Sequence, residues 1–569
     1  MICSRYRLAL LSAMLLATAS VLAAQNSASA DGFDGGRASR PSGRAGTRGL
    51  HEQNDPVLRA MLEEMQRSKG QLKLADVQAP YYVDYRLMDV DQYMAEAAFG
   101  AVRTSLRTRV RMLRIVVRVG DYKQDSYYGP GEGMVDVGPL DDDETGLRHQ
   151  LWLGTDRAYK AASEALTAKQ AELKKYSVDQ QVDDFANASP VQLVAPVAKL
   201  DFSPEPWLAT LEEASGLYKS DPQIQSLNAS LRFTVTNRYF VSSEGAVVRT
   251  ADSFYQVFVG GYTQAADGMR LDRSHGYQVR QMKDLPTKAE VLSRTRGLLT
   301  SLKELREAPV SEEEYRGPVL LSADAAAGVM SELVGPNLLG NRPMLGQNAR
   351  TTGDWANNYK SRVLPDFLSV VDDPTLTSFE GRALLGNYEV DDEGVKASRV
   401  SLIEKGQLVN YLLSRAPIRD FPNSNGHGRA SVTGPPTSSL GNLIVQSSDA
   451  LSTDDLKKKL IEACKQRNLP YGYFVETLGP RLAPRLLYRI STKDGHEELV
   501  RGAVFGDLDT RTLRNDIVAA GKEFDSEDRL DPIPQSVVSP ALLFDELEVK
   551  RGDVAKQKLP EYPPPAGTE

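Results

Sequence analysis

One carboxylate in the second half of the chain stands where an enzyme places an acid or a base. Glu332 is the only charged residue in the stretch GVMSELVGPNLLG, residues 328–340, and a Gly-Pro break follows it closely. A lone carboxylate in such surroundings is either a general acid or base, or the remnant of a lost site. Other residues of the sequence must distinguish these two interpretations.

The histidines supply no second catalytic or metal-binding group by spacing alone. No two of them are closer than 69 residues, so no pair on one helix can hold a metal ion. His427 lies in a long loop rich in Gly and hydroxyl residues, NSNGHGRASVTGPPTSS, whose backbone N–H groups can face a ligand. An ordinary surface loop fits the same residues. The five histidines are His51, His149, His275, His427 and His496.

The two cysteines exclude a disulfide framework and a zinc site made of several cysteines. Cys3 precedes an apolar N-terminal run, so only Cys464 would remain in a processed chain. Cys464 falls in phase with Leu456 and Leu460 on a predicted helix within residues 451–468, which favours a place in the core.

The N-terminus has the pattern of a secretory signal peptide. Arg5 and Arg7 precede the apolar run LALLSAMLLATASVLAA, and small-residue cleavage sites follow within residues 1–30. Its removal leaves 66 of the 68 basic residues against 76 acidic ones, a net charge of −10, which argues against a nucleic-acid partner. We therefore expect an exported protein, periplasmic or extracellular, with no integral membrane span.

Length and composition predict at least two large domains, because 569 residues are too many for one core. A Gly-, Arg- and Ser-rich linker covers residues 31–54, and a Pro-rich flexible tail covers 551–569. The stretch SEEEYRGP at 311–318 suggests a boundary, so we expect domains at 55–310 and 311–550.

The predicted elements mix strands and helices without regular alternation, which indicates the α+β class with antiparallel meanders in both domains. Residues 231–265 and 386–414 are typical of meanders, with Gly245, Gly394 and Gly406 in the turns. The predicted helices cover 157–176, 287–306 and 323–334. Six arginines between Arg103 and Arg118 are interpreted as the solvated face of a sheet, with Leu113, Ile115, Val117 and Val119 turned inward.

The second half resembles the TldD/PmbA family, the "modulator of gyrase" peptidases. The resemblance rests on GNYEVDDEGVKASRVSLIEKGQLVNYLLSRAP, GRASVTGPPTSSLGNLIV and the closing segment LLYRISTKDGHEELVRGAVFGDLDTRTLRNDIVAAG. It runs from about Asp55 to Val549 and is specific from Gly317 onward. It implies two α+β domains, zinc as the metal of active members, and assembly as dimers or as pairs of an active and an inactive subunit.

The same resemblance explains residues 328–340, the stretch that contains Glu332. Active members carry HExxxH on a helix, and Glu332 matches its general base, but Ser331 and Pro336 stand where the two metal-binding histidines belong. The third ligand of the family is a Cys near the C-terminus, and GKEFDSEDRLDPIPQSVVS contains none. Since zinc needs about three protein ligands, no metal or other cofactor is expected.

Three hypotheses follow. The first is a non-catalytic family member that acts as a partner subunit or peptide-binding protein, a homodimer or a heterodimer with another member. It would bind a peptide or unfolded protein in a groove with His427, Thr433 and Asn442 in its wall. The second is an active hydrolase with a site rebuilt from Glu332 and either His275 or His427. The third is a structural envelope protein.

Overall fold

The computed structural model describes residues 55–73, 77–176 and 182–552. The predicted signal peptide, the linker and His51 lie outside this part, as does nearly all of the predicted tail. Helices combine with antiparallel and mixed sheets, which confirms the α+β class. No helix in the described ranges is long and apolar enough to cross a membrane.

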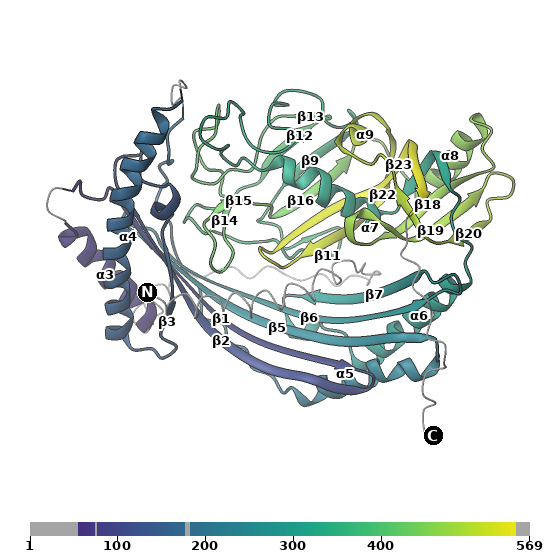
Figure 1. Ribbon diagram of the computed structural model, residues 1–569, viewed down its shortest axis with the longest axis horizontal. Coiled ribbons are helices and arrows are strands. Elements are labelled where there is room, and N and C mark those ends of the chain that lie inside the picture. The colour runs from purple at the N-terminus through teal and green to yellow at the C-terminus, as the bar shows by residue number, and fades with distance from the viewer. Residues whose placement is uncertain (1–54, 74–76, 177–181, 553–569) are drawn as a thin grey trace.

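The N-terminal half is built on a seven-stranded, strongly curved sheet (Figure 1). Its order is β3-β2-β1-β5-β6-β4, and β7 also pairs with β6. The predicted turn after Ser242 joins β5 to β6, and Gly245 supplies its positive φ of 102°. The strands are β1 Tyr82–Ala98, β2 Ala101–Arg118, β3 Met134–Gly138, β4 Gln192–Val194, β5 Ile224–Ser242, β6 Val247–Gln264 and β7 Arg270–Val279.

Helices cover one face of this sheet. α3 and α4 pack near one end and α5 and α6 near the other, so odd-numbered residues of β1 such as Leu87 and Ala95 are buried in two successive clusters. The prediction for α4 was too short, because the helix starts thirteen residues earlier, where Asp143 caps it through Thr145 N. The helices are α3 Pro56–Gln71, α4 Glu144–Leu173, α5 Glu205–Gly216 and α6 Lys288–Glu307.

The opposite face of the sheet meets the C-terminal half, as Figure 1 shows. The interpretation of the six arginines as a solvated face was therefore wrong for half of them. Leu113, Ile115, Val117 and Val119 are buried as predicted, and the first three arginines are exposed. Arg111, Arg114 and Arg118 are buried, because the other half of the chain and nearby carboxylates supply partners: Arg114 donates to the carbonyl of Thr433, while Arg111 and Arg118 pair with Asp89 and Asp125.

The C-terminal half contains a twelve-stranded mixed sheet whose main path is β13-β12-β9-β16-β23-β8-β18-β19-β20. α8, Thr453–Gln466, carries Cys464 into a core cluster, as predicted. The helices α7 and α9 cover Ala323–Val329 and Thr510–Asn515. The principal strands are β8 Glu314–Leu321, β9 Leu368–Asp372, β12 Val400–Glu404, β13 Gln407–Leu408, β16 Asn442–Ser447, β18 Tyr471–Leu478, β19 Pro484–Ser491, β20 Glu497–Val500, β22 Ile517–Arg529 and β23 Gln535–Arg551.

The predicted second meander is only partly regular. β12 and β13 form a hairpin whose turn residues Lys405 and Gly406 both have positive φ, as a tight turn requires. The preceding segment contains a single bridge between Val390 and Lys396 in place of a strand pair. Its backbone is held instead by the buried Asp391, whose carboxylate accepts from the N–H groups of Glu393, Val395 and Gly428. The carboxyl group of Asp391 therefore adds to the few backbone hydrogen bonds that cross this loop, such as Ala397 N to the carbonyl of Glu389.

Candidate functional site

The backbone around Glu332 departs from an ordinary helix. α7 continues into a π-helix, Met330–Val334, in which the N–H of Gly335 donates to the carbonyl of Met330, five residues earlier. Such π turns are rare and are frequent at functional sites. This turn brings positions 331 and 336 one turn apart, which is the separation of the two histidines in HExxxH. The scaffold of the motif is present, although its ligand types are not.

The two positions cannot bind a metal ion together. Ser331 is 3% exposed, and its hydroxyl oxygen has no hydrogen-bond partner. Pro336 is exposed and carries no donor atom. A neutral hydroxyl is a weak zinc ligand beside the thiolate and imidazole groups that hold zinc in proteins.

The carboxylate of Glu332 forms an ion pair with a residue that the sequence did not place beside it. Arg529, the last residue of β22, donates from Nη2 to Glu332 Oε1 at 2.5 Å. The side chain of Glu332 is 48% exposed and that of Arg529 is 24% exposed. Arg529 lies in the C-terminal segment where the family resemblance implies the Cys ligand. The carboxylate is therefore paired with a positive charge from the same C-terminal segment in which a metal ligand was expected.

Further carboxyl groups near this ion pair have pKa values that burial raises. Burial, with help from Asp525 and Glu527, raises the pKa of Asp324 to about 8. Burial also raises the pKa of Glu527 to about 7, against the opposing charge of Arg529. It raises the pKa of Asp528 to about 6. At neutral pH Asp324 is therefore mostly protonated and Glu527 is partly protonated, whereas Asp528 is mostly ionised.

The residues present do not fit the zinc ion that the family resemblance implies. In the part of the chain that the structure describes, no group of three or more His, Cys, Asp or Glu side chains is arranged to hold a metal ion. The two ligand positions of the π turn are a hydroxyl and a proline, and the carboxylate between them is paired with an arginine.

Neither histidine of the rebuilt-hydrolase hypothesis contacts Glu332. His275 lies on β7, and its Nε2 is 3.3 Å from Thr295 Oγ1 of α6. Burial lowers the pKa of His275 to about 4, so this imidazole is neutral. His427 Nε2 is 3.2 Å from Asp372 Oδ1, and its Nδ1 faces Asn425. Each imidazole has its own partners in a different part of the fold.

The predicted groove residues His427 and Asn442 lie together in the interior. Both are fully buried, and the carboxylate of Asp372 joins them: its Oδ1 accepts from the N–H of Asn442 at 3.2 Å and lies beside His427. They support the long loop from within. Thr433 lies at the tip of this loop, where its carbonyl accepts from Arg114 of β2 at 3.3 Å. The loop therefore contacts the N-terminal sheet.

The edge strand β7 carries polar atoms that the fold leaves without partners. In the described chain it pairs only with β6, and Figure 1 shows it as the strand of its sheet nearest to α7 and β11, Arg382–Ala383. Arg273 Nη1 donates to Thr477 Oγ1 of β18 at 3.0 Å, so β7 also lies close to β18. Four side-chain atoms of β7 are buried without a hydrogen bond: Arg273 Nε, His275 Nδ1, Tyr277 Oη and Gln278 Oε1.

Comparison with known proteins places the chain beside metallopeptidases. Residues 314–551 match the PmbA/TldA metallopeptidase C-terminal domain. A metalloprotease of Methanocaldococcus jannaschii is 24% identical over 233 residues, 40% of this chain and 48% of that protein. A metalloprotease of Methanothermobacter thermautotrophicus is 25% identical over 234 residues, 38% of this chain and 45% of that protein. The chain thus spans about half the length of the curated relatives it matches.

Solved structures share the fold over most of the chain. TldE from Thermococcus kodakarensis aligns with a TM-score of 0.58 at 14% identity, covering 86% of this chain and 99% of that one. A candidate modulator of DNA gyrase from Thermotoga maritima gives the same values. At this identity the likeness establishes the fold alone, and it extends to both halves of the chain.

Proposed function

Because the chain belongs to the TldD/PmbA family, we propose that it is an exported, non-catalytic member that binds extended peptides. In this role it is a partner subunit or a peptide-binding component in proteolysis. Export follows from the N-terminal leader sequence. The loss of catalysis follows from Ser331 and Pro336 on the retained π turn, and from the pairing of Glu332 with Arg529.

The observation that carries peptide binding is the edge of β7. An extended peptide that joins a sheet edge satisfies its own backbone groups and those of the edge strand. In the described chain β7 pairs with β6 alone, so the backbone groups along its other edge are available to a ligand strand.

An active hydrolase built on Glu332 is the weaker alternative. It needs a histidine beside this carboxylate, whereas His275 and His427 are engaged with Thr295 and Asp372. The guanidinium of Arg529 also donates a hydrogen bond to Glu332 Oε1. The geometry around the carboxylate therefore favours a binding protein over a catalyst.

The test is binding of an unstructured peptide with acetylated and amidated ends, followed by fluorescence anisotropy. A control peptide of the same sequence carries N-methyl groups on alternate residues, which remove one row of strand hydrogen bonds. We expect the control to bind about tenfold or more weakly, since each backbone hydrogen bond contributes roughly 0.5–1.5 kcal/mol. Mass spectrometry should show the bound peptide intact after prolonged incubation.

Three results would contradict this proposal in different ways. Equal binding of the two peptides would exclude strand addition. Cleavage of the peptide, at a rate that falls in Glu332→Gln, would establish the rebuilt hydrolase. No binding of either peptide would leave the structural envelope protein as the remaining hypothesis.

A further inference from the structure

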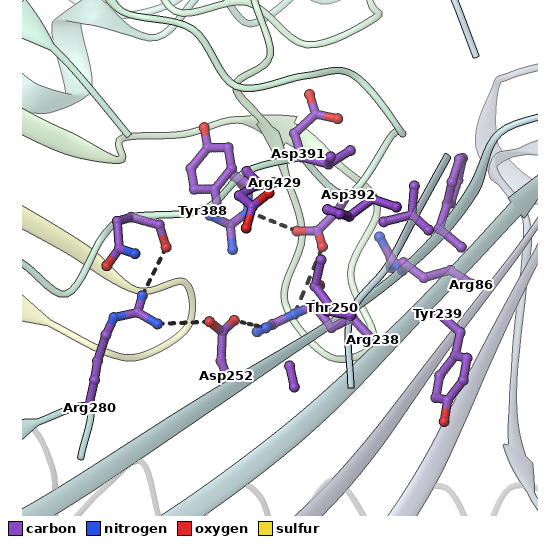
Figure 2. Close-up of a pocket in the computed structure, with 18 residues that line it drawn as sticks. Arg86, Arg238, Tyr239, Thr250, Asp252, Arg280, Tyr388, Asp391, Asp392 and Arg429 are labelled. Atoms are coloured by element: carbon purple, nitrogen blue, oxygen red, sulfur yellow. Dashed lines mark hydrogen bonds and ion pairs between the residues drawn. The ribbon is translucent and has the colours of Figure 1, made fainter. Parts of the chain in front are cut away.

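A cavity of about 160 Å³ lies between the two halves of the chain, with a mixed polar and apolar lining. Its floor is formed by β1, β5 and β6, and its roof by residues 387–392 and Arg429 (Figure 2). Four arginine side chains line it, three from the N-terminal sheet region and one from the C-terminal half. They are Arg86, Arg238, Arg280 and Arg429.

Part of this positive charge is neutralised inside the cavity wall. Burial raises the pKa of Asp252, but the guanidinium groups of Arg238 and Arg280 outweigh it and bring the pKa to about 2. Arg280 Nη1 donates to Asp252 at 2.9 Å, and Arg238 pairs with the other carboxylate oxygen. Above them, Arg429 donates from Nε to Asp392 at 3.1 Å and lies over the ring of Tyr388. Figure 2 shows these pairs facing one another across the cavity.

Several polar atoms of the lining have no partner. Arg86 is only 3% exposed, and its Nη1 makes no hydrogen bond; its Nη2 donates to the carbonyl of Gly434. The Nε atoms of Arg238 and Arg280 are also buried without a hydrogen bond. The side-chain oxygen of Asn387 is a buried acceptor that also has no hydrogen-bond partner. Arg238 Nε lies 3.9 Å from Asp392 Oδ1, so Arg86 Nη1, Arg280 Nε and the Asn387 oxygen are the lining atoms left without a polar partner in the described chain.

The arginines of the lining differ in their partners. Arg238 and Arg280 pair with Asp252, and Arg429 pairs with Asp392. Arg86 has no carboxylate within ion-pair distance in the described part of the chain, and the carboxyl group of Asp391 is engaged by three backbone N–H groups of its own loop. Burial lowers the pKa of Arg86 despite the favourable charge of Asp392, and the repulsion of Arg114 lowers it further.

We infer that this cavity binds the C-terminal carboxylate of a peptide, with Arg86 Nη1 as its principal donor. A single arginine without a carboxylate partner suits a carboxylate monoanion better than a phosphate dianion. Asn387 can accept the N–H of the terminal residue. The apolar part of the lining, formed by Phe240, Val248 and Val390, suits the terminal side chain. This inference rests on the peptide-binding function proposed above and specifies where the C-terminus of the peptide binds.

The position of the cavity along β7 also sets the direction of the peptide. β7 ends at Val279, and the next residue, Arg280, lines the cavity. A peptide on the edge of β7 with its carboxylate at this end runs parallel to β7. An antiparallel peptide would bring its amino terminus to the arginines, where the charges repel.

The experiment measures binding of one short peptide, Ala-Ala-Ala-Leu, to the full chain by isothermal titration calorimetry under three conditions. These are the free carboxylate, the C-terminal amide, and the free carboxylate in the presence of inorganic phosphate. We expect the carboxylate to bind about tenfold or more tightly than the amide, because charge-assisted hydrogen bonds to arginine replace neutral ones. Phosphate in millimolar excess should leave carboxylate binding within about twofold.

Arg86→Gln and Arg232→Gln form a matched pair of variants. Arg232 lies on β5 six residues before Arg238, on the same face, and pairs with Asp531 of the C-terminal half outside the cavity. Arg86→Gln should reduce the carboxylate preference to less than about twofold while amide binding remains, and Arg232→Gln should keep the full preference. Retained amide binding shows that Arg86→Gln is folded.

Equal affinity of the carboxylate and the amide for the unmodified chain would overturn this inference, whether or not the variants fold. Displacement of the peptide carboxylate by phosphate would overturn the choice of ligand in favour of a general oxyanion. If blocked peptides bind along β7 but the carboxylate adds nothing, the proposed function stands and only the terminal site fails. If neither kind of peptide binds, both fail.

Discussion

Replacing Arg415 by methionine is expected to lower the free energy of unfolding by about 3–5 kcal/mol, because it removes one partner of a buried ion pair. Arg415 belongs to the C-terminal half and is 1% exposed. Both its terminal nitrogens reach the carboxylate of Glu244 at 2.8 Å, and its Nε and Nη2 reach the carbonyl of Ala186. Its guanidinium also lies 3.9 Å from the ring centre of Phe185.

All these partners belong to the N-terminal half, so the contacts of Arg415 stabilise the packing of the two halves against each other. Chemical denaturation followed by tryptophan fluorescence and circular dichroism should show a lower midpoint and a separation of the two signals. Arg467→Met is the control, because Arg467 is 33% exposed and pairs with the half-exposed Asp545 and Glu546; about 1 kcal/mol or less is expected there. Equal losses in the two variants would contradict the role given to Arg415.

The protein is also expected to lose stability as the pH rises from 6 to 8. The pKa values of Asp324, Glu527 and Asp528 are raised to about 8, 7 and 6 in the folded state, chiefly by burial. The folded chain therefore binds more protons than the unfolded chain above pH 4. Stability from these groups is fully present below their unfolded pKa values and is lost as the pH passes their folded ones. Each group contributes up to about 1.4 kcal/mol per pH unit, so the loss over this interval should be roughly 2–4 kcal/mol.

Urea denaturation at pH 6 and pH 8 measures this loss. Asp324→Asn keeps the uncharged form of the side chain at every pH and should reduce the difference between the two conditions by about half. Asp454→Asn, at an exposed position in the first turn of α8, should leave it unchanged. If stability is constant or rises from pH 6 to pH 8, the carboxyl groups beside Glu332 are ionised in the folded protein.

Much of the fold could be predicted because its signals are local. Alternation placed Leu113 and Ile115 inside, turn glycines such as Gly245 and Gly406 marked the hairpins, and helical spacing placed Cys464 in the core. The start of α4 was missed because its first turns carry mixed residues that only the tertiary contacts of Leu147 and Leu151 sort into a buried stripe.

The site was predictable only where a motif marked it. Glu332, Ser331 and Pro336 are neighbours in sequence, whereas Arg529 reaches the carboxylate from almost two hundred residues away. β7 and its unpartnered polar atoms gave no sequence signal, because hydrogen-bond satisfaction depends on the folded neighbours. Arg86 and Arg238 occupy alternating polar positions that are typical of a solvated sheet face. That face lines a cavity only because residues of the second half of the chain cover it.

Zinc content is the most direct test of the central proposal that this chain has no catalytic metal site. The purified chain is incubated with excess zinc, freed of unbound metal, and analysed by inductively coupled plasma mass spectrometry beside Glu332→Gln. We expect less than about 0.1 zinc per chain in both, since a hydroxyl, a proline and an arginine-bound carboxylate cannot supply the three ligands that zinc needs. Near-stoichiometric zinc that falls in Glu332→Gln would contradict the account and show that this chain binds the metal of an active peptidase.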